Sequence, residues 1–327
     1  MTKNCDSMQG VACWIPRMFV KRLMKLFENE RKSNMNKGFY TALGTPLDAN
    51  GNFIPGSMAR QIEYQIEAGA SGLLVMGSMG QMSYIKQSEY AKVAAESVKA
   101  VKGRVPVLVG VTDLSIHRVM ERVDALKDID GIDGIVSTVP YYSFVTQDDI
   151  YEFYNEIANR SGRATYLYDL PVITKTATAP ATVKKLWKNP LIKGIKSSNM
   201  VTQRLLHQAE DRPDDFAMMY SNLDDFDIAY KFGIDKNLDG MFSCTPKTAQ
   251  RMYQALDAGD YDVGSAALND ILMLRNLFVE TPCLFKAFSH AMHLIGCEGN
   301  FAIDYQKEIP DEWKEKVTAA MRALGEI

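Results

Sequence analysis

The sequence is poor in cysteine and histidine, and neither residue type is spaced as a metal site requires. The five cysteines are odd in number, scattered and without a CxxC pair. They are Cys5, Cys13, Cys244, Cys283 and Cys297. The four histidines form no HExxH motif, and His290 and His293 are spaced as ordinary helix residues often are. We therefore expect no bound metal, and reduced thiols as in a cytoplasmic protein.

The chain also lacks the loops that bind nucleotide phosphates and the charge that binds nucleic acid. No GxGxxG motif follows the first candidate strand, and no GxxxxGK(S/T) motif occurs. The net charge is only −3, and the body of the chain has no basic stripe with interleaved aromatic residues. These absences argue against nucleotide-binding folds and make nucleic acid an unexpected partner.

The first 36 residues differ in charge from the remainder. Residues 1–36 hold seven basic and three acidic side chains, a net charge of +4. Residues 14–27 are a candidate for a short basic amphipathic helix, which would lie on a membrane surface or on a partner. This segment is too short and too charged to span a bilayer, and it has no signal-peptide cleavage pattern. An alternative of equal weight is a native start at Met35, with the preceding residues a disordered tail or a translation artefact.

From Gly38 onward, short apolar runs alternate with segments of helical periodicity. Eight runs are candidate strands: Phe39–Leu43, Gly72–Met76, Val105–Gly110, Gly134–Thr138, Ala164–Tyr168, Leu191–Lys196, Phe216–Tyr220 and Asp239–Ser243. Strands rich in Val, Ile and Leu without strict alternation are typical of a parallel sheet covered on its outer face. Eight such units predict a closed (β/α)8 TIM barrel over residues 37–258, and residues 259–327 are expected to add C-terminal helices.

One predicted strand, Leu191–Lys196, ends on a lysine. Strand alternation puts Ile192, Gly194 and Lys196 on one face, so Lys196 shares the face of a buried isoleucine. Burial disfavours an unpaired ammonium, so a lysine at this position is a candidate nucleophile for carbonyl carbon. On this stretch alone, a side chain that reaches out to solvent is the simpler interpretation.

In a barrel of this type, chemistry is built at the carboxyl ends of the strands. The loop of Gly77, Ser78 and Met79 after the second strand is suited to binding a small anion through backbone N–H groups. Other strand ends carry Tyr141, Tyr142, Tyr168, Lys196, Asn222, Asp224, Asp225 and Ser243. Each has a structural alternative, because glycines make turns, tyrosines fill barrel tops and aspartates cap helices.

Four landmarks occur in a fixed order at these strand ends. They are Gly77-Ser78-Met79-Gly80, Pro140-Tyr141-Tyr142, Tyr168-Asp169-Leu170-Pro171 and Gly194-Ile195-Lys196. Tyr142 and Tyr168 are 26 residues apart, and Tyr168 and Lys196 are 28 apart. In order and spacing, the chain from about Gly38 onward resembles the dihydrodipicolinate synthase / N-acetylneuraminate lyase family, the pyruvate-dependent class I aldolases.

The resemblance implies a role for each landmark. Lys196 would form a Schiff base with the keto group of pyruvate or of a longer 2-oxo acid, so no separate cofactor is implied. Tyr168 would shuttle protons with Ser78 in its relay, and the Gly77 loop would hold the pyruvate carboxylate on the N–H groups of Ser78 and Met79. Tyr142 would reach into a neighbouring subunit, which implies a homo-oligomer, usually a tetramer of tight dimers.

Four residues depart from the family pattern. Met79 stands where threonine is common, and Gln81 replaces a glutamate. Ile173 falls where lysine-pathway synthases carry an arginine for aspartate semialdehyde, and Lys175 replaces a glycine. Loss of that guanidinium speaks against 4-hydroxy-tetrahydrodipicolinate synthase activity.

Other positions favour a sugar-acid lyase. Ser198 falls where N-acetylneuraminate lyases have threonine, and Ser243 aligns with a serine that contacts the sugar chain. Asn222, Asp224 and Asp225 fall where those lyases bind polyol hydroxyls, although acidic pairs recur across the family.

We therefore predict a cytoplasmic class I aldolase or lyase that interconverts a sugar-derived 2-oxo acid with pyruvate and an aldehyde. N-acetylneuraminate-like and 2-keto-3-deoxy-aldonate substrates are favoured. Two alternatives stay open: the lysine-pathway synthase, and a ligand-binding homologue without activity, which Met79 and Gln81 motivate.

Overall fold

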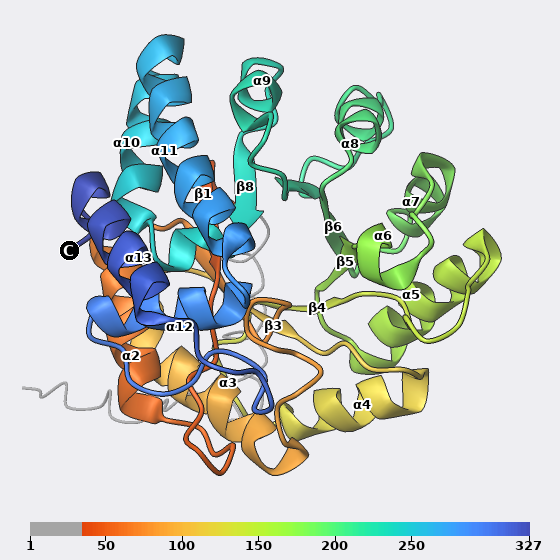
Figure 1. Ribbon diagram of the computed structural model, residues 1–327. Coiled ribbons are helices and arrows are strands. Elements are labelled where there is room, and N and C mark those ends of the chain that lie inside the picture. Colours follow the sequence, from red (N-terminus) through yellow and green to blue (C-terminus); the bar gives the residue numbers. More distant parts are fainter. Residues whose placement is uncertain (1–34) are drawn as a thin grey trace, which may run out of the picture. The chain divides into compact units, whose positions relative to one another are not determined.

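The computed structural model describes residues 35–327 (Figure 1). The helix predicted over residues 14–27 lies outside the described residues, so that helix and the membrane contact considered for it stay sequence predictions. Among the helices of residues 35–327, none is both long enough and apolar enough to cross a membrane.

Eight parallel strands close into a barrel in chain order, and β8 pairs with β1. The strands are β1 (Gly38–Ala42), β2 (Gly72–Val75), β3 (Val107–Gly110), β4 (Gly134–Ser137), β5 (Thr165–Asp169), β6 (Ile192–Ser197), β7 (Ala217–Tyr220) and β8 (Lys236–Asp239). The predicted (β/α)8 barrel is confirmed.

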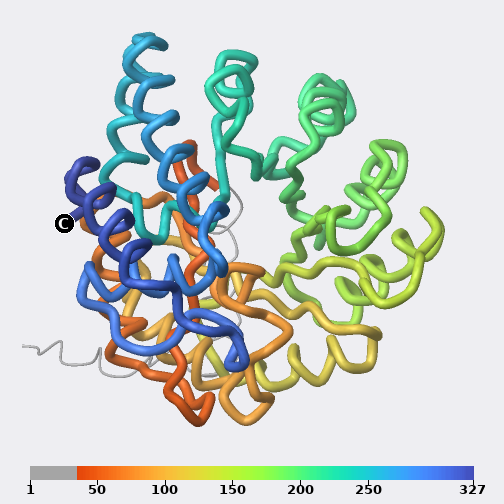
Figure 2. The backbone as a smooth tube through the Cα atoms, viewed as in Figure 1, coloured from red at the N-terminus to blue at the C-terminus, as the bar shows by residue number. Residues whose placement is uncertain are grey.

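Helices connect successive strands and surround the barrel (Figure 1). They are α2 (Pro55–Glu67), α3 (Gln87–Val101), α4 (Ile116–Ala125), α5 (Gln147–Ser161), α6 (Pro171–Thr174), α7 (Pro180–Leu186), α8 (Met200–His207), α9 (Phe226–Lys231) and α10 (Pro246–Asp257). The predicted C-terminal helices are also confirmed, as α11 (Tyr261–Glu280), α12 (Leu284–Leu294) and α13 (Asp311–Leu324), drawn in blue in Figure 2. Helix α11 packs against α9, α10, α12 and α13.

Local sequence signals explain where helices begin and end. At α5, the Thr146 hydroxyl accepts a hydrogen bond from the Asp149 N–H at 3.2 Å, and the Asp149 carboxylate accepts one from the Thr146 N–H at 2.8 Å. This capping box satisfies backbone donors that the first turn leaves unpaired. The helix ends at Gly162, whose φ of +61° is readily adopted by glycine.

Strand alternation divides the apolar core into two layers. Side chains such as Tyr40, Leu74 and Val136 pack inside the barrel. Their neighbours along the strands, such as Phe39 and Val75, pack outward in the larger cluster that the helices cover. The strands are therefore apolar on both faces, which explains their continuous apolar runs.

The predicted position of the eighth strand, Asp239–Ser243, is wrong. The strand is Lys236–Asp239, and residues Met241–Ser243 form a short 3-10 helix, η1. The true strand is mostly polar, and its fully buried Asn237 donates its backbone N–H to the Tyr253 hydroxyl at 3.0 Å. The apolar Met241 and Phe242, which led to the prediction, pack in the outer core instead.

The predicted alignment of side chains along β6 is also wrong in part. Thr165 of β5 pairs with Ile192, but the next pair is Tyr166 with Gly194, so the register skips Lys193. This bulge turns Ile192 to the outer core, whereas a Cβ on Gly194 would lie 2.8 Å from the Tyr166 ring inside the barrel. Ile192 therefore does not share the face of Gly194, although Lys196 is buried as expected, at 7% exposure.

Candidate active site

Lys196 and Tyr168 form the centre of the candidate site. They are paired neighbours at the carboxyl ends of β6 and β5. The Lys196 Nζ lies 3.9 Å from the centroid of the Tyr168 ring, and the tyrosine is only 5% exposed. A lysine amine is thus held against a phenol at the end of the barrel where such folds bind substrates.

Ser78 joins this pair from the end of β2. Its hydroxyl donates to the Tyr168 Oη at 3.3 Å. The structure therefore brings together Ser78, Tyr168 and Lys196, three of the four residues predicted to be catalytic. A proton can pass between the two hydroxyl groups along this hydrogen bond.

The loop that carries Ser78 has a tightly constrained backbone. Met76 and Gln81, on either side of it, have positive φ values of 57° and 59°. A side chain on Gly80 would place its Cβ 2.8 Å from the Leu43 carbonyl oxygen. Such conformations cost roughly 1–3 kcal/mol each for residues other than glycine, and they persist at sites that the surrounding structure holds fixed.

Buried Arg122, on α4, holds this loop and was not foreseen from the sequence. Its guanidinium donates to the Met82 carbonyl at 3.1 Å and to the Thr112 carbonyl, and its Nη2 lies 3.0 Å from the Asp113 carboxylate. Thr112 in turn accepts a hydrogen bond from the Thr138 N–H at 2.9 Å. Arg122 therefore connects the loop after β2 to the ends of β3 and β4.

Asp169, at the end of β5, ties this strand to β6. Its carboxylate accepts hydrogen bonds from the Ser197 hydroxyl and the Thr178 N–H, both at 2.8 Å. Burial raises the pKa of this carboxyl group, against the effect of these hydrogen bonds. The neighbouring Ser198, predicted to bind substrate, is exposed.

Tyr142 lies in the exposed loop between β4 and α5. It is 83% exposed, and its neighbour Tyr141 donates to the Ser83 hydroxyl at 2.9 Å. The predicted role of Tyr142 in a second subunit stays a prediction. Ile173, at the position where an arginine was considered, is 46% exposed on α6, and the Lys175 Nζ lies 5.6 Å from the centre of the Phe144 ring.

The predicted polyol-binding residues form a separate group after β7. Asp225 accepts hydrogen bonds from the Tyr220 hydroxyl at 2.6 Å and from the Asn222 amide at 3.0 Å. Asp224 is more exposed, and Arg275 on α11 donates to both of its carboxylate oxygens, at 2.9 Å and 2.8 Å. This hydrogen-bonded ion pair lowers the pKa of Asp224.

Ser243 and Met79 occupy different environments at the end of β8. Ser243 is fully buried and donates its hydroxyl to the Ala42 carbonyl at 2.9 Å, so the structure places it in the packing between η1 and β1. Met79 packs against Gly240, the residue after β8. A Cβ on Gly240 would lie 2.7 Å from the Met79 Cε. Met79 thus reaches from the Ser78 loop to the residue that follows β8.

Two further charged residues belong to this side of the site. Asp239 ends β8, where burial raises the pKa of its carboxyl group while the charges of Lys196 and Arg275 act in the opposite direction. Correct placement of β8 would have put Asp239 at a strand end and identified it. Arg275 lies in a helix after the barrel, and nothing in the sequence pattern points to it.

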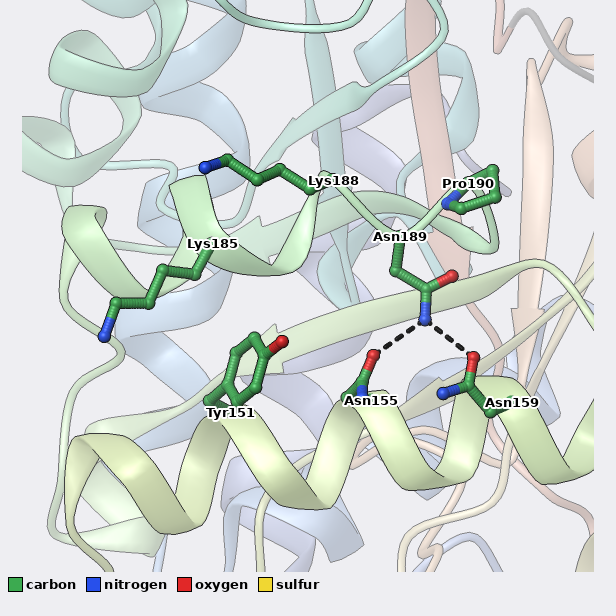
Figure 3. Close-up of a pocket in the computed structure, with 7 residues that line it drawn as sticks. All are labelled: Tyr151, Asn155, Asn159, Lys185, Lys188, Asn189 and Pro190. Carbon is green, nitrogen blue, oxygen red and sulfur yellow. Dashed lines mark hydrogen bonds between the residues drawn. The ribbon is translucent and has the colours of Figure 1, made fainter.

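The pocket in Figure 3 is a different feature of the molecule. It lies between α5 and the segment that leads into β6. Its lining residues are Tyr151, Asn155, Asn159, Lys185, Lys188, Asn189 and Pro190. The Asn189 amide donates to the side-chain oxygens of Asn155 and Asn159 (Figure 3). Because Pro190 comes just before β6, this pocket lies toward the strand end opposite Lys196.

Relatives of this chain match it over nearly the whole of the described residues. A protein named 4-hydroxy-tetrahydrodipicolinate synthase from Bartonella bacilliformis is 31% identical over 305 residues, which cover 90% of this chain and 99% of that protein. The protein of the same name from Methylococcus capsulatus is 30% identical over 302 residues, with 89% and 99% covered.

Solved structures share the fold at lower identity. A prophage protein of the dihydrodipicolinic acid synthase family from E. coli K12, in complex with pyruvate, superposes with a TM-score of 0.81 at 21% identity, covering 90% of this chain and all of that one. The sialic acid aldolase of Ruminococcus gnavus gives 0.82 at 17% identity, with 89% and 98% covered. The model of the dihydrodipicolinate synthetase family matches residues 35–323. The chain is therefore a member of the dihydrodipicolinate synthetase family, within the pyruvate-dependent class I aldolases.

Proposed function

We propose that the protein is a Schiff-base-forming aldolase or lyase that uses pyruvate, or releases it, through Lys196. The observation that carries this proposal is the buried contact of Lys196 with Tyr168, which in turn accepts a hydrogen bond from Ser78. The pyruvate complex of the E. coli K12 family member supports the same ligand.

The chemistry balances without a redox step. The Lys196 amine attacks C2 of pyruvate, and the keto oxygen leaves as water with one proton from the amine and one from Tyr168, so that an iminium remains. The Tyr168 phenolate then takes a proton from C3 to give an enamine, whose C3 forms the new bond to the aldehyde carbon while Tyr168 returns the proton to the aldehyde oxygen. Water then releases the product and regenerates Lys196, and cleavage runs through the same steps in reverse.

For the second substrate we favour an aldehyde derived from a sugar, as with N-acetylneuraminate-like or 2-keto-3-deoxy-aldonate compounds. Asp224 and Asp225 offer acceptors for hydroxyl groups, and Ile173 offers no charge for a second carboxylate. The sialic acid aldolase among the structural neighbours supports this class at the level of fold.

A second candidate is 4-hydroxy-tetrahydrodipicolinate synthase activity, which condenses pyruvate with aspartate semialdehyde. The names of the relatives at 30% and 31% identity favour it. Ile173 counts against it, because an isoleucine cannot form the bidentate contact with a carboxylate that a guanidinium forms.

We also propose that the enzyme is a cytoplasmic homo-oligomer, a tetramer of tight dimers in which Tyr142 completes a neighbouring site. The 83% exposure of this large side chain supports the proposal. So do exposed apolar side chains on α8 and on or just after α9, namely Val201, Leu205, Ile228 and Phe232. Sedimentation of the wild type and of Tyr142→Ala would measure the assembly.

Trapping with borohydride tests the proposed chemistry directly. The protein is incubated with pyruvate, reduced and digested, and the mass gain is located by mass spectrometry. A reduced pyruvate adduct on Lys196 is the expected result. If neither pyruvate nor other 2-oxo acids label Lys196, the proposed chemistry is wrong, and the non-catalytic alternative takes its place.

A further inference from the structure

Four residues of alternating charge lead from Lys196 to the surface. Lys196 lies at the end of β6, Asp224 follows β7 and Asp239 ends β8, so all three lie at the carboxyl end of the barrel, and the charges of Lys196 and Arg275 both act on the Asp239 carboxyl group. Arg275 holds Asp224 through two hydrogen bonds, at 2.9 Å and 2.8 Å. The row therefore runs Lys196, Asp239, Arg275, Asp224, and its outer half depends on a helix that follows the barrel.

We propose that Arg275 is a positioning residue that sets aldehyde specificity: it fixes Asp224 as an acceptor for the hydroxyl groups of an uncharged polyhydroxy aldehyde. This inference rests on the proposed aldolase function and specifies the class of its second substrate.

The hydrogen bonds of Arg275 engage four of its five guanidinium N–H donors and hold the guanidinium against Asp224. Besides its two bonds to Asp224, its Nη2 and Nε donate to the Asn276 side-chain oxygen at 2.9 Å and 3.3 Å. Each of the three guanidinium nitrogens thus already has an acceptor. Asp224 differs, because an ionised carboxylate can accept about four hydrogen bonds and Arg275 supplies two. With its side chain 57% exposed, Asp224 has acceptor capacity left for hydroxyl groups.

The net charge of Asp239, Arg275 and Asp224 disfavours binding of an aldehyde that carries a carboxylate. Once Lys196 is an iminium, the carboxylate of the bound pyruvate offsets its charge. Arg275 then faces Asp224 and Asp239, so the net charge is −1 when Asp239 is ionised and zero when it is protonated. In neither state is there a surplus positive charge for an anionic aldehyde, whereas hydroxyl donors find carboxylate acceptors.

Lys175, at the end of α6, is the rival determinant. Its exposed ammonium lies over the Phe144 ring, close to Ile173 in the chain. If Lys175 governed selection, the enzyme would prefer an aldehyde that carries a carboxylate. Measuring the reaction rate with both aldehyde classes therefore distinguishes selection by Arg275 from selection by Lys175.

The test compares the full-length wild type with Arg275→Gln, Arg275→Lys, Asp224→Asn and Lys175→Met. Aldol addition of pyruvate is measured with D-erythrose, an uncharged polyhydroxy aldehyde, and with succinate semialdehyde, which carries a carboxylate. Borohydride trapping of pyruvate on Lys196 is measured in parallel. Arg104→Gln is the matched control, because Arg104 forms a similar bidentate pair with Glu63, at 2.7 Å for both bonds, before β3.

We expect the wild type to prefer D-erythrose. Arg275→Gln and Asp224→Asn should lower kcat/KM for D-erythrose by about 10- to 100-fold, the range for hydrogen bonds to charged groups. The pyruvate adduct should change little, because neither variant alters Lys196, Tyr168 or Ser78. Arg275→Lys should recover part of the loss, and the double variant Arg275→Gln/Asp224→Asn should lose no more than either single variant.

Several results would overturn the proposal. A wild type that prefers succinate semialdehyde, with the preference lost in Lys175→Met, would assign selection to Lys175. An unchanged aldehyde ratio in Arg275→Gln would make the ion pair merely structural. Either result with a normal adduct on Lys196 leaves the proposed aldolase chemistry intact, whereas absence of the adduct in the wild type would refute that chemistry itself.

Discussion

The two sides of the candidate site are built in different ways. On one side, Lys196, Tyr168 and Ser78 come from β6, β5 and the loop after β2, and the first two are at most 7% exposed. On the other side, Asp224 and Arg275 meet across a loop and a helix, with their side chains 57% and 28% exposed. The reacting groups are thus fixed by the barrel, whereas the charged side depends on peripheral elements. Such a division allows the second substrate to change while the chemistry is kept.

Removal of the amine should give the largest effect. Lys196→Ala should reduce turnover to background with every aldehyde, because no nucleophile remains to form the iminium. Steady-state assays measure the loss, and circular dichroism with thermal unfolding checks that the fold is intact. Undiminished turnover in a folded Lys196→Ala variant would show that the buried side does not carry the chemistry.

Removal of the phenol oxygen should have the next largest effect. Tyr168→Phe keeps the ring against Lys196 but removes the proton shuttle, so kcat should fall by roughly 100-fold or more. The loss should be equal for charged and uncharged aldehydes, which separates it from the effects expected at Arg275. An unchanged rate would exclude Tyr168 from the proton relay.

Loss of the Ser78 hydroxyl should be milder. Ser78→Ala removes the hydrogen bond to the Tyr168 Oη, and formation of the pyruvate adduct should slow by about tenfold, the value of one hydrogen bond to a group that changes charge. Rapid mixing with pyruvate followed by borohydride quench measures this step. If the aldehyde preference changed while the adduct formed at the normal rate, Ser78 would act in selection of the second substrate and not in the proton relay.

The same division explains what sequence reasoning could find. Apolar runs identified seven strands, and with them the ends that carry Ser78, Tyr168 and Lys196. The eighth strand was misplaced because the buried Asn237 bonds through its backbone N–H to Tyr253 and adds nothing to a hydrophobic pattern. Asp239 was lost with it.

Residues that act from outside the barrel leave no periodic signal at all. Arg275 meets Asp224 across 51 residues of sequence, and Arg122 reaches Met82 across 40. Such pairs arise only when helices are placed on the barrel, so their partners follow from packing and not from spacing. The bulge at Lys193 belongs to the same class, because register is set between strands and not within one.

The smallest effect should come from replacement of Asp239. We expect its carboxylate to lower the stability of the fold and to contribute to substrate specificity. Burial raises the pKa of its carboxyl group in the folded protein, so the folded state holds this proton more tightly than the unfolded state does. The resulting stabilisation is present below the ordinary pKa of about 3.8 and is lost as the pH rises through the folded value. At neutral pH the ionised group therefore costs stability.

Asp239→Asn should therefore raise Tm at pH 7 by roughly 2–4 °C, and the gain should largely vanish near pH 3.5, where the carboxyl group begins to be protonated in the unfolded chain as well. Thermal unfolding between pH 3.5 and pH 8 measures the gain, with Asp304→Asn, at an exposed position, as the control.

A stabilised variant whose preference for D-erythrose has also weakened would show that the carboxyl group is retained for substrate selection at a cost in stability. A variant that is destabilised at pH 7 would instead make Asp239 a structural partner of the Met241 N–H, to which it now bonds at 2.8 Å. In that case Arg275 and Asp224 would select the substrate without a contribution from Asp239.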